Sequence, residues 1–489
     1  MSFWESVDQF LSGRIAFPAV NFVMNRKNIL GNYRKLLRAE RYSKEALREL
    51  QFQNLSAVLR HAYTWSPFYA RRFKEIGLAP GDIGSLEDMR LIPPLLREDL
   101  IENRLDLVDR RYRDCIRNAE KASKSPGAPI PLAGFRGRSL VRNSSSGSSG
   151  TPTVFYEDGS TTALSWAHEL RLKKWFGLSP GVREARMSAT AAEYAAMSKR
   201  PSAREMLWNQ MTLPGYFLSD REYEICIRKI RTFKPRVLWG PTPALTGLAH
   251  YVRRTNEDIS RCRPDLVISR AAPLYSHEKK LLTEIFDCPV TNIYGSREVG
   301  HVAMNCPHGS IHVNQESYLV EIERPGTDSE KAGPGNLLIT PLFKSPMPFL
   351  RYRVGDLAEL GDSDCPCGRP QMLLRKIMGR AGEVFKTKDG RLIEPNFWCI
   401  AFEGGRQSRD VERFQVVYRA EDRIRFRIVR RPSYSGETET ELRHFIEQNF
   451  PAHIQVEFEY VSEIKPQASG KYIFVVNEIG HEEEKCAHV

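Results

Sequence analysis

Apolar residues recur at three- and four-residue steps between residues 42 and 78, with charged side chains between them. Leu47, Leu50, Leu55, Val58 and Leu59 carry this spacing. Steps of this size place the apolar side chains on one face of a helix, which can then pack against a core. The pattern predicts helices here, and we extend this largely helical lobe over residues 1–138.

The pattern changes at about residue 139, where short β-rich runs begin to alternate with amphipathic stretches. A β-run at 236–239 precedes a helix expected over 244–254, and a helix expected over 276–286 precedes a β-run at 289–294. Alternation of strands and helices is typical of α/β domains. We therefore expect residues 139–379 to form an α/β region that completes a large domain over residues 1–379.

A third pattern follows Gly379. Apolar and polar residues alternate at 414–418 and 424–429, which predicts a β-hairpin, and a helix over about 438–450 and a strand over 454–460 follow. At 489 residues the chain also exceeds the roughly 250–300 residues at which one core stops growing. We expect a separate small α+β domain over residues 380–489.

The formal net charge of +12 makes nucleic-acid binding a function class to consider. Lys and Arg are scattered, however, in pairs such as Arg110-Arg111 and Arg430-Arg431 rather than gathered in one stretch. We expect no nucleic-acid partner and interpret the charge as a solvated surface, or as a field that attracts anionic small molecules such as ATP or coenzyme A.

The sequence has no uninterrupted apolar run of about 18 residues. We therefore expect no transmembrane segment and a cytoplasmic protein whose nine cysteines are reduced thiols. A homodimer is left open.

Seven hydroxyl side chains and two glycines fill residues 144–153, between β-like runs at 140–142 and 154–156. Glycines let backbone N–H groups turn toward one point, where they and the hydroxyls can bind phosphate oxygens. A Ser/Gly tract is also typical of a linker, and this one lacks the Gly-Lys-Ser/Thr of a Walker A loop. Its place between two β-runs favours a phosphate-binding loop made of Ser145, Ser146, Gly147, Ser148, Ser149, Gly150, Thr151 and Thr153.

Three shorter motifs carry polar groups suited to a nucleotide and a metal ion. The sequence Tyr-Gly-Ser-Arg-Glu at 294–298 ends a β-run and offers an aromatic face, a hydroxyl and a carboxylate ligand for Mg²⁺. Asp356 follows a β-run, and its two oxygens can hold both hydroxyls of a ribose. Lys471 lies in a tight turn near the C-terminus. Taken alone, each motif is better explained by a structural role than by a functional one.

Five motifs follow one another along the chain: the hydroxyl-rich loop, Tyr-Gly-Ser-x-Glu, Tyr-Arg-x-Gly-Asp, Gly-Arg and Ser-Gly-Lys. In this order, they resemble the core motifs of the adenylate-forming superfamily. The resemblance spans about residues 42–477. Within the superfamily, the chain most resembles the phenylacetate-CoA ligases and the related CapK-type proteins. It implies an α/β protein with a large adenylation domain of mixed sheets and helices and a small, mobile α+β C-terminal domain.

The resemblance also implies an activity. The chain is expected to use ATP and Mg²⁺ to convert a small carboxylic acid, aryl or arylacetic, into acyl-AMP with release of pyrophosphate, and then to transfer the acyl group to coenzyme A. Two alternatives stay open. One is transfer of the acyl or nucleotidyl group to another acceptor in surface polysaccharide assembly, and the other is a nucleotide-binding protein without catalysis.

Residue roles follow from the resemblance alone. It assigns the β- and γ-phosphates to the loop at 145–153, adenine to Tyr294, the α-phosphate to Ser296, Mg²⁺ to Glu298 and the ribose to Asp356. Catalysis is assigned to Lys471, which reaches the carboxylate and α-phosphate, with Glu298 and Arg380. Further nucleotide contacts are expected from Ala272, Pro273, Asn292 and Gly295.

The sequence departs from the family pattern in three segments. Thr151 stands where many relatives have lysine, Ala272 stands in Ser-Arg-Ala-Ala-Pro where the family often has Gly-x-Glu-Pro, and Gly382 and Glu383 replace a pair of hinge aspartates. These departures leave the level of activity open.

Cys306 and His312 precede Cys365 and Cys367 by about 50 residues. Three thiolates and an imidazole make a closed set suited to structural Zn²⁺, and similar sets in related sequences support this interpretation. His308 is an alternative ligand, and four unrelated loop residues are the alternative without metal. Three tryptophans, Trp208, Trp239 and Trp398, are candidates for an acid pocket or for the core.

Overall fold

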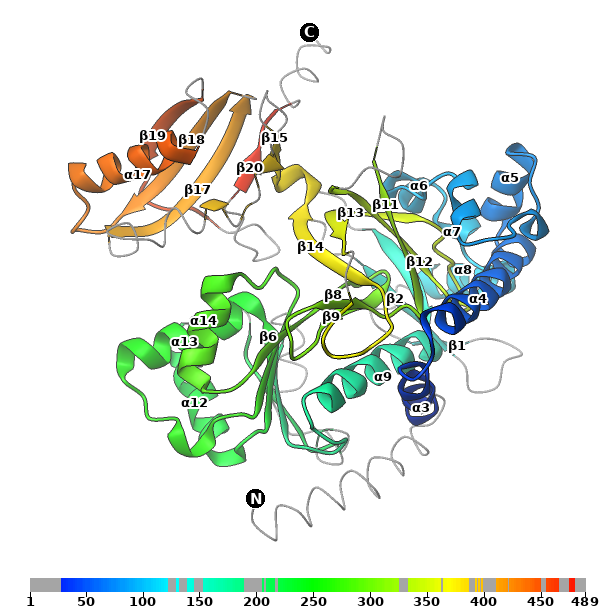
Figure 1. Cartoon of the computed structure of the whole chain (residues 1–489), viewed down its shortest axis with the longest axis horizontal. Coiled ribbons are helices and arrows are strands. Elements are labelled where there is room, and N and C mark those ends of the chain that lie inside the picture. The colour runs from blue at the N-terminus through cyan, green and yellow to red at the C-terminus, as the bar shows by residue number, and fades with distance from the viewer. Residues whose placement is uncertain are drawn as a thin grey trace. The chain divides into compact units, whose positions relative to one another are not determined.

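The fold was examined in a computed structural model (Figure 1). The structure describes residues 28–121, 129–131, 139–144, 153–188, 205, 208–215, 219–324, 333–361, 364–386, 392–393, 395, 397–398, 410–420, 422–449, 454–465 and 475–479. It divides into two compact units: one comprises residues 1–333, 337–354 and 359–376, and the other comprises 334–336, 355–358 and 377–489.

Helices fill the first 94 residues of the described chain, 28–121, as the apolar spacing predicts. Ser43 starts the longest helix by accepting a hydrogen bond from the backbone of Ala46. Its buried face carries Leu47, Leu55, Val58 and Leu59, so the three- and four-residue steps do mark the side that packs inward. The helices are α3 (Ile29–Ala39), α4 (Lys44–Trp65), α5 (Pro67–Glu75), α6 (Arg97–Glu102), α7 (Arg104–Leu107) and α8 (Arg113–Lys121).

A large mixed sheet has the strand order β11-β12-β13-β14-β10-β9-β8-β7-β6-β4-β5. From β8 to β5 all neighbouring strands are parallel, and from β8 to β14 they are antiparallel. The parallel strands are β4 (Glu184–Met187), β5 (Gln210–Leu213), β6 (Val237–Pro241), β7 (Leu266–Arg270) and β8 (Val290–Ser296). The others are β9 (Gly300–Asn305), β10 (Ile311–Val313), β11 (Tyr318–Glu323), β12 (Gly335–Pro341), β13 (Tyr352–Leu360) and β14 (Leu373–Arg380).

Helices cover both faces of the parallel strands. Three helices, α12 (Asp220–Phe233), α13 (Thr242–Thr255) and α14 (Ser276–Phe286), pack on one face, where Leu238 and Val267 are buried (Figure 1). On the opposite face, α9 (Gly159–Trp175) packs against Trp239 and Ile268. Alternate residues of each strand therefore belong to different cores.

A three-stranded sheet precedes α9 in the chain. It is formed by β1 (Pro129–Pro131), β2 (Ser139–Ser144) and β3 (Val154–Asp158), and β2 and β3 are antiparallel with Ser144 opposite Val154. Asp158 ends β3 and accepts hydrogen bonds from the backbone of Ser160 and Thr161, which starts α9.

The second unit contains a four-stranded sheet of order β19-β18-β17-β20. The hairpin expected here is present as antiparallel β17 (Val411–Ala420) and β18 (Arg423–Arg430), followed by α17 (Gly436–Asn449), β19 (Gln455–Tyr460) and β20 (Val475–Asn477). Trp398 is fully buried here with Tyr418 and Phe426, so its side chain belongs to a core. The fold class predicted from the sequence, a large α/β region with a smaller separate α+β sheet domain, is confirmed.

Among the described residues, no helix has the length and hydropathy needed to cross a membrane. The cytoplasmic location and the absence of a nucleic-acid partner remain predictions.

Candidate functional site

The Tyr-Gly-Ser-Arg-Glu motif lies where β8 ends and turns into β9. Because β4 to β8 run in one direction, their carboxyl ends meet at one edge of the sheet, where α/β proteins commonly bind ligands. Glu298 lies in the turn itself. A Cβ atom at Gly295 would come within 1.9 Å of the Gly300 carbonyl oxygen, so only glycine allows the two strands to approach this closely.

The base of the hydroxyl-rich loop contacts this turn. The Arg297 side chain donates a hydrogen bond of 3.3 Å to the carbonyl of Ser144, the last residue of β2. Residues 145–152 lie outside the described chain. Thr153, just before β3, is buried and its hydroxyl accepts a hydrogen bond of 3.2 Å from Arg97. Two motifs that are far apart in sequence therefore meet at the sheet edge.

Two of the expected nucleotide contacts have buried atoms without partners. Asn292 Oδ1 and Ser296 Oγ are shielded from solvent, and neither has a hydrogen-bond partner among the residues that the structure describes. Buried polar atoms are almost always hydrogen-bonded, so both are available to a ligand.

Ala272 and Pro273 follow β7 at the same edge. Ala271 has φ +66°, which turns the chain sharply, and the Thr242 hydroxyl donates a hydrogen bond of 3.1 Å to the Ala272 carbonyl. The Thr242 hydroxyl also lies 2.6 Å from Ser269 Oγ. A hydrogen-bonded turn, rather than the glutamate of the family pattern, fixes this segment.

Asp356 and Arg380 belong to the second unit, which we describe by itself. Arg380 Nε lies 3.5 Å from Asp356 Oδ1. Gly355 has φ +84°, and a Cβ there would lie 3.1 Å from the Arg380 guanidinium. The carboxylate assigned to ribose is therefore paired with the arginine assigned to the nucleotide. Lys471 lies outside the described residues.

The cysteine cluster is assembled as the spacing predicts. One ligand atom each from Cys306, His312, Cys365 and Cys367 lies within 4.8 Å of the others. The Sγ atoms of Cys306 and Cys365 are 3.6 Å apart, and Cys367 Sγ lies 3.3 Å from His312 Nε2. Tight turns shape both cysteine loops, because Gly309 N–H donates to the Cys306 carbonyl and Gly368 N–H donates to the Cys365 carbonyl.

The chemistry of these four groups fits a metal ion. Burial, followed by the charges of Arg369 and Arg171, lowers the pKa of His312 to about 4, so its ring is neutral, as a metal ligand must be. Burial, followed by the hydrogen bond with Cys365, raises the pKa of the Cys306 thiol to about 11, so a thiolate there needs a positive charge beside it. A divalent cation would supply that charge.

Residues 385–478 match the family model described as the CapK C-terminal domain. Over 440 residues the chain is 21% identical to Protein CapK of Staphylococcus aureus, and the match covers 88% of this chain and 89% of that protein. It is 24% identical over 352 residues to phenylacetate-coenzyme A ligase of Thermus thermophilus, covering 71% of this chain and 73% of that enzyme. The chain is a homologue of CapK and of the phenylacetate-CoA ligases.

Solved structures show the same fold. A 2-hydroxyisobutyryl-CoA ligase in the postadenylation state, in complex with 2-HIB-AMP, matches with a TM-score of 0.66 and 18% identity over 90% of this chain and 91% of that one. The same ligase in the thioesterfication state, with 2-HIB-AMP and CoA, matches with a TM-score of 0.56 over 92% and 94%. The CapK-like chain thus has the fold of a CoA ligase along most of its length.

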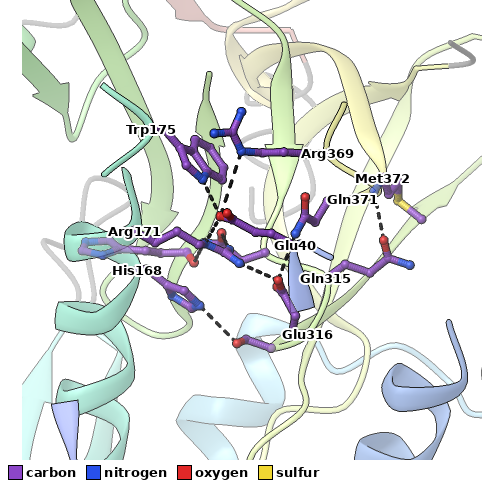
Figure 2. Close-up of polar contacts among 12 residues, drawn as sticks. Glu40, His168, Arg171, Trp175, Gln315, Glu316, Arg369, Gln371 and Met372 are labelled. Carbon is purple, nitrogen blue, oxygen red and sulfur yellow. Dashed lines mark hydrogen bonds and ion pairs between the residues drawn. The ribbon is translucent and has the colours of Figure 1, made fainter. Parts of the chain in front are cut away.

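A buried polar network next to the cysteine cluster was not predicted (Figure 2). Arg171, on α9, is fully buried and pairs with Glu316, while Trp175 donates a hydrogen bond of 2.5 Å to Glu40 at the end of α3. Arg369 lies over the Trp175 ring, which contacts His312 edge-on. The sequence signal was the unusual density of charged residues between Trp166 and Trp175 in one helix, which no amphipathic pattern explains.

Proposed function

We propose that this chain is an ATP-dependent, adenylate-forming ligase that activates a carboxylic acid as acyl-AMP and transfers the acyl group to coenzyme A. One observation carries the proposal: the hydrogen bond from Arg297 to Ser144 joins two motifs 153 positions apart at the ligand-binding edge of the parallel strands. Homologues named phenylacetate-coenzyme A ligase support the same activity.

The groups at this edge fit a nucleotide with Mg²⁺. Ser296 Oγ and Asn292 Oδ1 have no partner among the described residues and are available to it, and Glu298 on the turn is a hard oxygen ligand of the kind that Mg²⁺ prefers. We assign the loop at 145–153 to the β- and γ-phosphates, Tyr294 to adenine and Asp356 to the ribose. Bound Mg²⁺ would offset negative charge on the phosphates.

The proposed reaction has two halves. A carboxylate oxygen of the acid attacks the α-phosphorus, the bond to pyrophosphate breaks, and acyl-AMP forms. The thiol sulfur of coenzyme A then attacks the acyl carbon, AMP leaves, and the thiol proton is released. In the first half, Ser296 and Lys471 would hold the reacting oxygens by hydrogen bonds and charge, with no covalent enzyme nucleophile.

A second function differs only in the acceptor. The match to CapK covers 89% of that protein, and the family model that matches the C-terminal region is the CapK one. Because neither description names coenzyme A, we also propose, as the second function, an adenylating enzyme that passes its acyl or nucleotidyl group to another acceptor. An aryl or arylacetic acid is proposed for the CoA ligase because its homologues are named for phenylacetate.

We also propose that Cys306, His312, Cys365 and Cys367 bind one structural Zn²⁺. Four protein ligands complete a tetrahedral site, which leaves no position for a substrate. The ion would join the loop that precedes β10 to the loop that precedes β14.

Identification of the products tests the acceptor directly. The protein is incubated with ATP, Mg²⁺ and a panel of carboxylic acids, with and without coenzyme A, and the products are identified by mass spectrometry. We expect acyl-AMP and pyrophosphate without coenzyme A, and AMP with an acyl thioester when it is added. Acyl-AMP that forms but is never consumed by coenzyme A would contradict the ligase and favour the other acceptor.

A further inference from the structure

We propose that the acid activated by this chain carries a hydroxyl group away from its reacting carboxylate, and that Trp239 Nε1 and Ser188 Oγ recognise this hydroxyl. The inference rests on the proposed function and names the class of acid within it.

Trp239 and Ser188 lie on one face of the sheet, on or next to the neighbouring strands β6 and β4. Trp239 is the middle residue of β6 and lies directly opposite Arg186 of β4. Ser188 follows β4 by one residue, and its N–H donates a hydrogen bond of 3.0 Å to the Leu213 carbonyl, so the strand pairing continues through it. Alternate strand residues point the same way, which places the side chains of Arg186, Ser188 and Trp239 on the face that α9 covers.

Both side chains end in a buried polar atom with no partner. The Trp239 side chain is fully buried and Ser188 is 6% exposed. Neither Trp239 Nε1 nor Ser188 Oγ has a hydrogen-bond partner within the described parts of the chain. A single buried donor without a partner is uncommon in proteins, and two on neighbouring strands, one of them at the carboxyl edge of the sheet, indicate groups reserved for a ligand.

The type of each atom defines what it can bind. The indole N–H only donates, whereas the serine hydroxyl both donates and accepts. A substrate hydroxyl complements the pair, because its oxygen accepts from Trp239 while its proton can be donated to Ser188. A plain aryl group offers neither and would leave both protein atoms buried and unpaired.

The surroundings of Trp239 are polar and already balanced in charge. The Arg186 guanidinium lies 4.8 Å from the Trp239 ring and 4.5 Å from the Trp166 ring, and it pairs with Glu169 at 2.5 Å and Glu184 at 2.9 Å. Burial alone would lower the pKa of Arg186, but the two carboxylates outweigh burial and raise it. Arg186 is therefore held as a cation by groups of the protein and does not require a second carboxylate on the acid.

Two more groups face this region. The Arg270 guanidinium lies 5.8 Å from the Trp239 ring, and His301 Nε2 lies 4.0 Å from Glu169. Arg270 brings a further positive charge, so a dicarboxylic acid is the ligand that the experiment must distinguish from a hydroxy acid.

The experiment compares acids that differ by one hydroxyl. Pyrophosphate release is measured for phenylacetate against its 3- and 4-hydroxy derivatives, for butyrate against 3-hydroxybutyrate, and for succinate. We expect one hydroxylated acid to exceed its unsubstituted partner in kcat/KM by about 100-fold or more, because a site built to bind a hydroxyl rejects the analogue that lacks it.

Two variants connect this preference to the two atoms. Trp239→Phe removes the N–H but keeps an aromatic ring, and Ser188→Ala removes the hydroxyl. Each should reduce the ratio of kcat/KM values within the preferred pair by about 10-fold, as expected for one lost hydrogen bond to a ligand. Because neither atom has a partner among the described residues, neither change should lower the thermal midpoint through a lost hydrogen bond.

Trp175→Phe is the matched control. Its N–H donates to Glu40, so this variant should lower the thermal midpoint but leave the acid preference unchanged. Equal use of the paired acids, succinate as the best substrate, or an unchanged preference in both Trp239→Phe and Ser188→Ala would overturn the inference. Pyrophosphate release with none of the acids would instead contradict the proposed function and this inference with it.

Discussion

Single residues at the sheet edge show why the chain uses these residue types. Gly295 stands where the β8–β9 hairpin closes, and a methyl group there would meet the backbone of Gly300 rather than a side chain that could move. The glycine of Tyr-Gly-Ser is thus required by the fold, while Ser296 and Glu298 beside it are available for chemistry.

Gly295→Ala should open this hairpin and displace the turn that carries Glu298. We expect a loss of about 1–3 kcal/mol in the free energy of unfolding, because the added methyl forces the backbone to shift, together with a weaker ATP affinity. Chemical denaturation and equilibrium ATP binding measure the two effects. Gly81→Ala is the control, since its Cβ would meet nothing within 4 Å, and equal behaviour of the two variants would contradict the account.

The sequence predicted single residues well where a contact is local in the chain. Cys306, His312, Cys365 and Cys367 were found because each pair is close in sequence and their donor types are specific. The unpaired polar atoms Ser188 Oγ and Trp239 Nε1 were not predicted, because the lack of a hydrogen-bond partner can be seen only once the strands are assembled into the sheet.

At the scale of elements, periodic segments were predicted and the buried charges of α9 were not. The helices at 44–75 and the hairpin at 411–430 follow regular apolar spacing that faces one core. By contrast, α9 packs between α3, the large sheet and the segments near residues 316 and 369, so polar side chains on several of its faces are buried and paired. Those partners come from distant parts of the chain, which no local pattern records.

Cys365→Ser tests the metal that we propose to join two of these segments. We expect about one Zn²⁺ per chain in the wild type and close to none in the variant, with a fall in the thermal midpoint of at least about 4 °C, because the loops at 306–312 and 365–367 lose their link. Elemental analysis and thermal unfolding measure these changes.

Cys115→Ser is the control, because Cys115 lies outside the cluster. This variant should keep the metal content and the thermal midpoint of the wild type. A wild-type protein that contains no metal after purification with zinc present, and whose stability a chelator does not change, would contradict the proposal.

For the whole molecule, we propose that the residues from about Arg380 onward rotate as a body about residues 379–383 between the two half-reactions. Gly379 has φ +90°, and Gly382 is exposed with open space around it. Two glycines in a short connection give the backbone freedom that such a motion needs. The boundary of the rotating body was expected at residue 380, and it remains a prediction.

Gly382→Pro should separate the two half-reactions. Proline fixes φ near −65°, so we expect one half-reaction to slow by at least about 10-fold while the other stays within about 3-fold of wild type. Acyl-AMP formation and thioester formation from supplied acyl-AMP are measured separately. Gly382→Ala should resemble the wild type, since a methyl group meets nothing there. Wild-type rates of both half-reactions in Gly382→Pro would show that this connection is not the hinge.

The measurement that tests the central claim most directly is the exchange of labelled pyrophosphate into ATP in the absence of coenzyme A. Exchange requires that the enzyme form acyl-AMP reversibly, so it reports adenylation whatever acceptor follows. We expect exchange that depends on both Mg²⁺ and a carboxylic acid, and that falls by at least about 100-fold in Lys471→Ala, because the charge assigned to the reacting oxygens is lost. Exchange that continues without any acid, or that Lys471→Ala leaves unchanged, would contradict this account of the site.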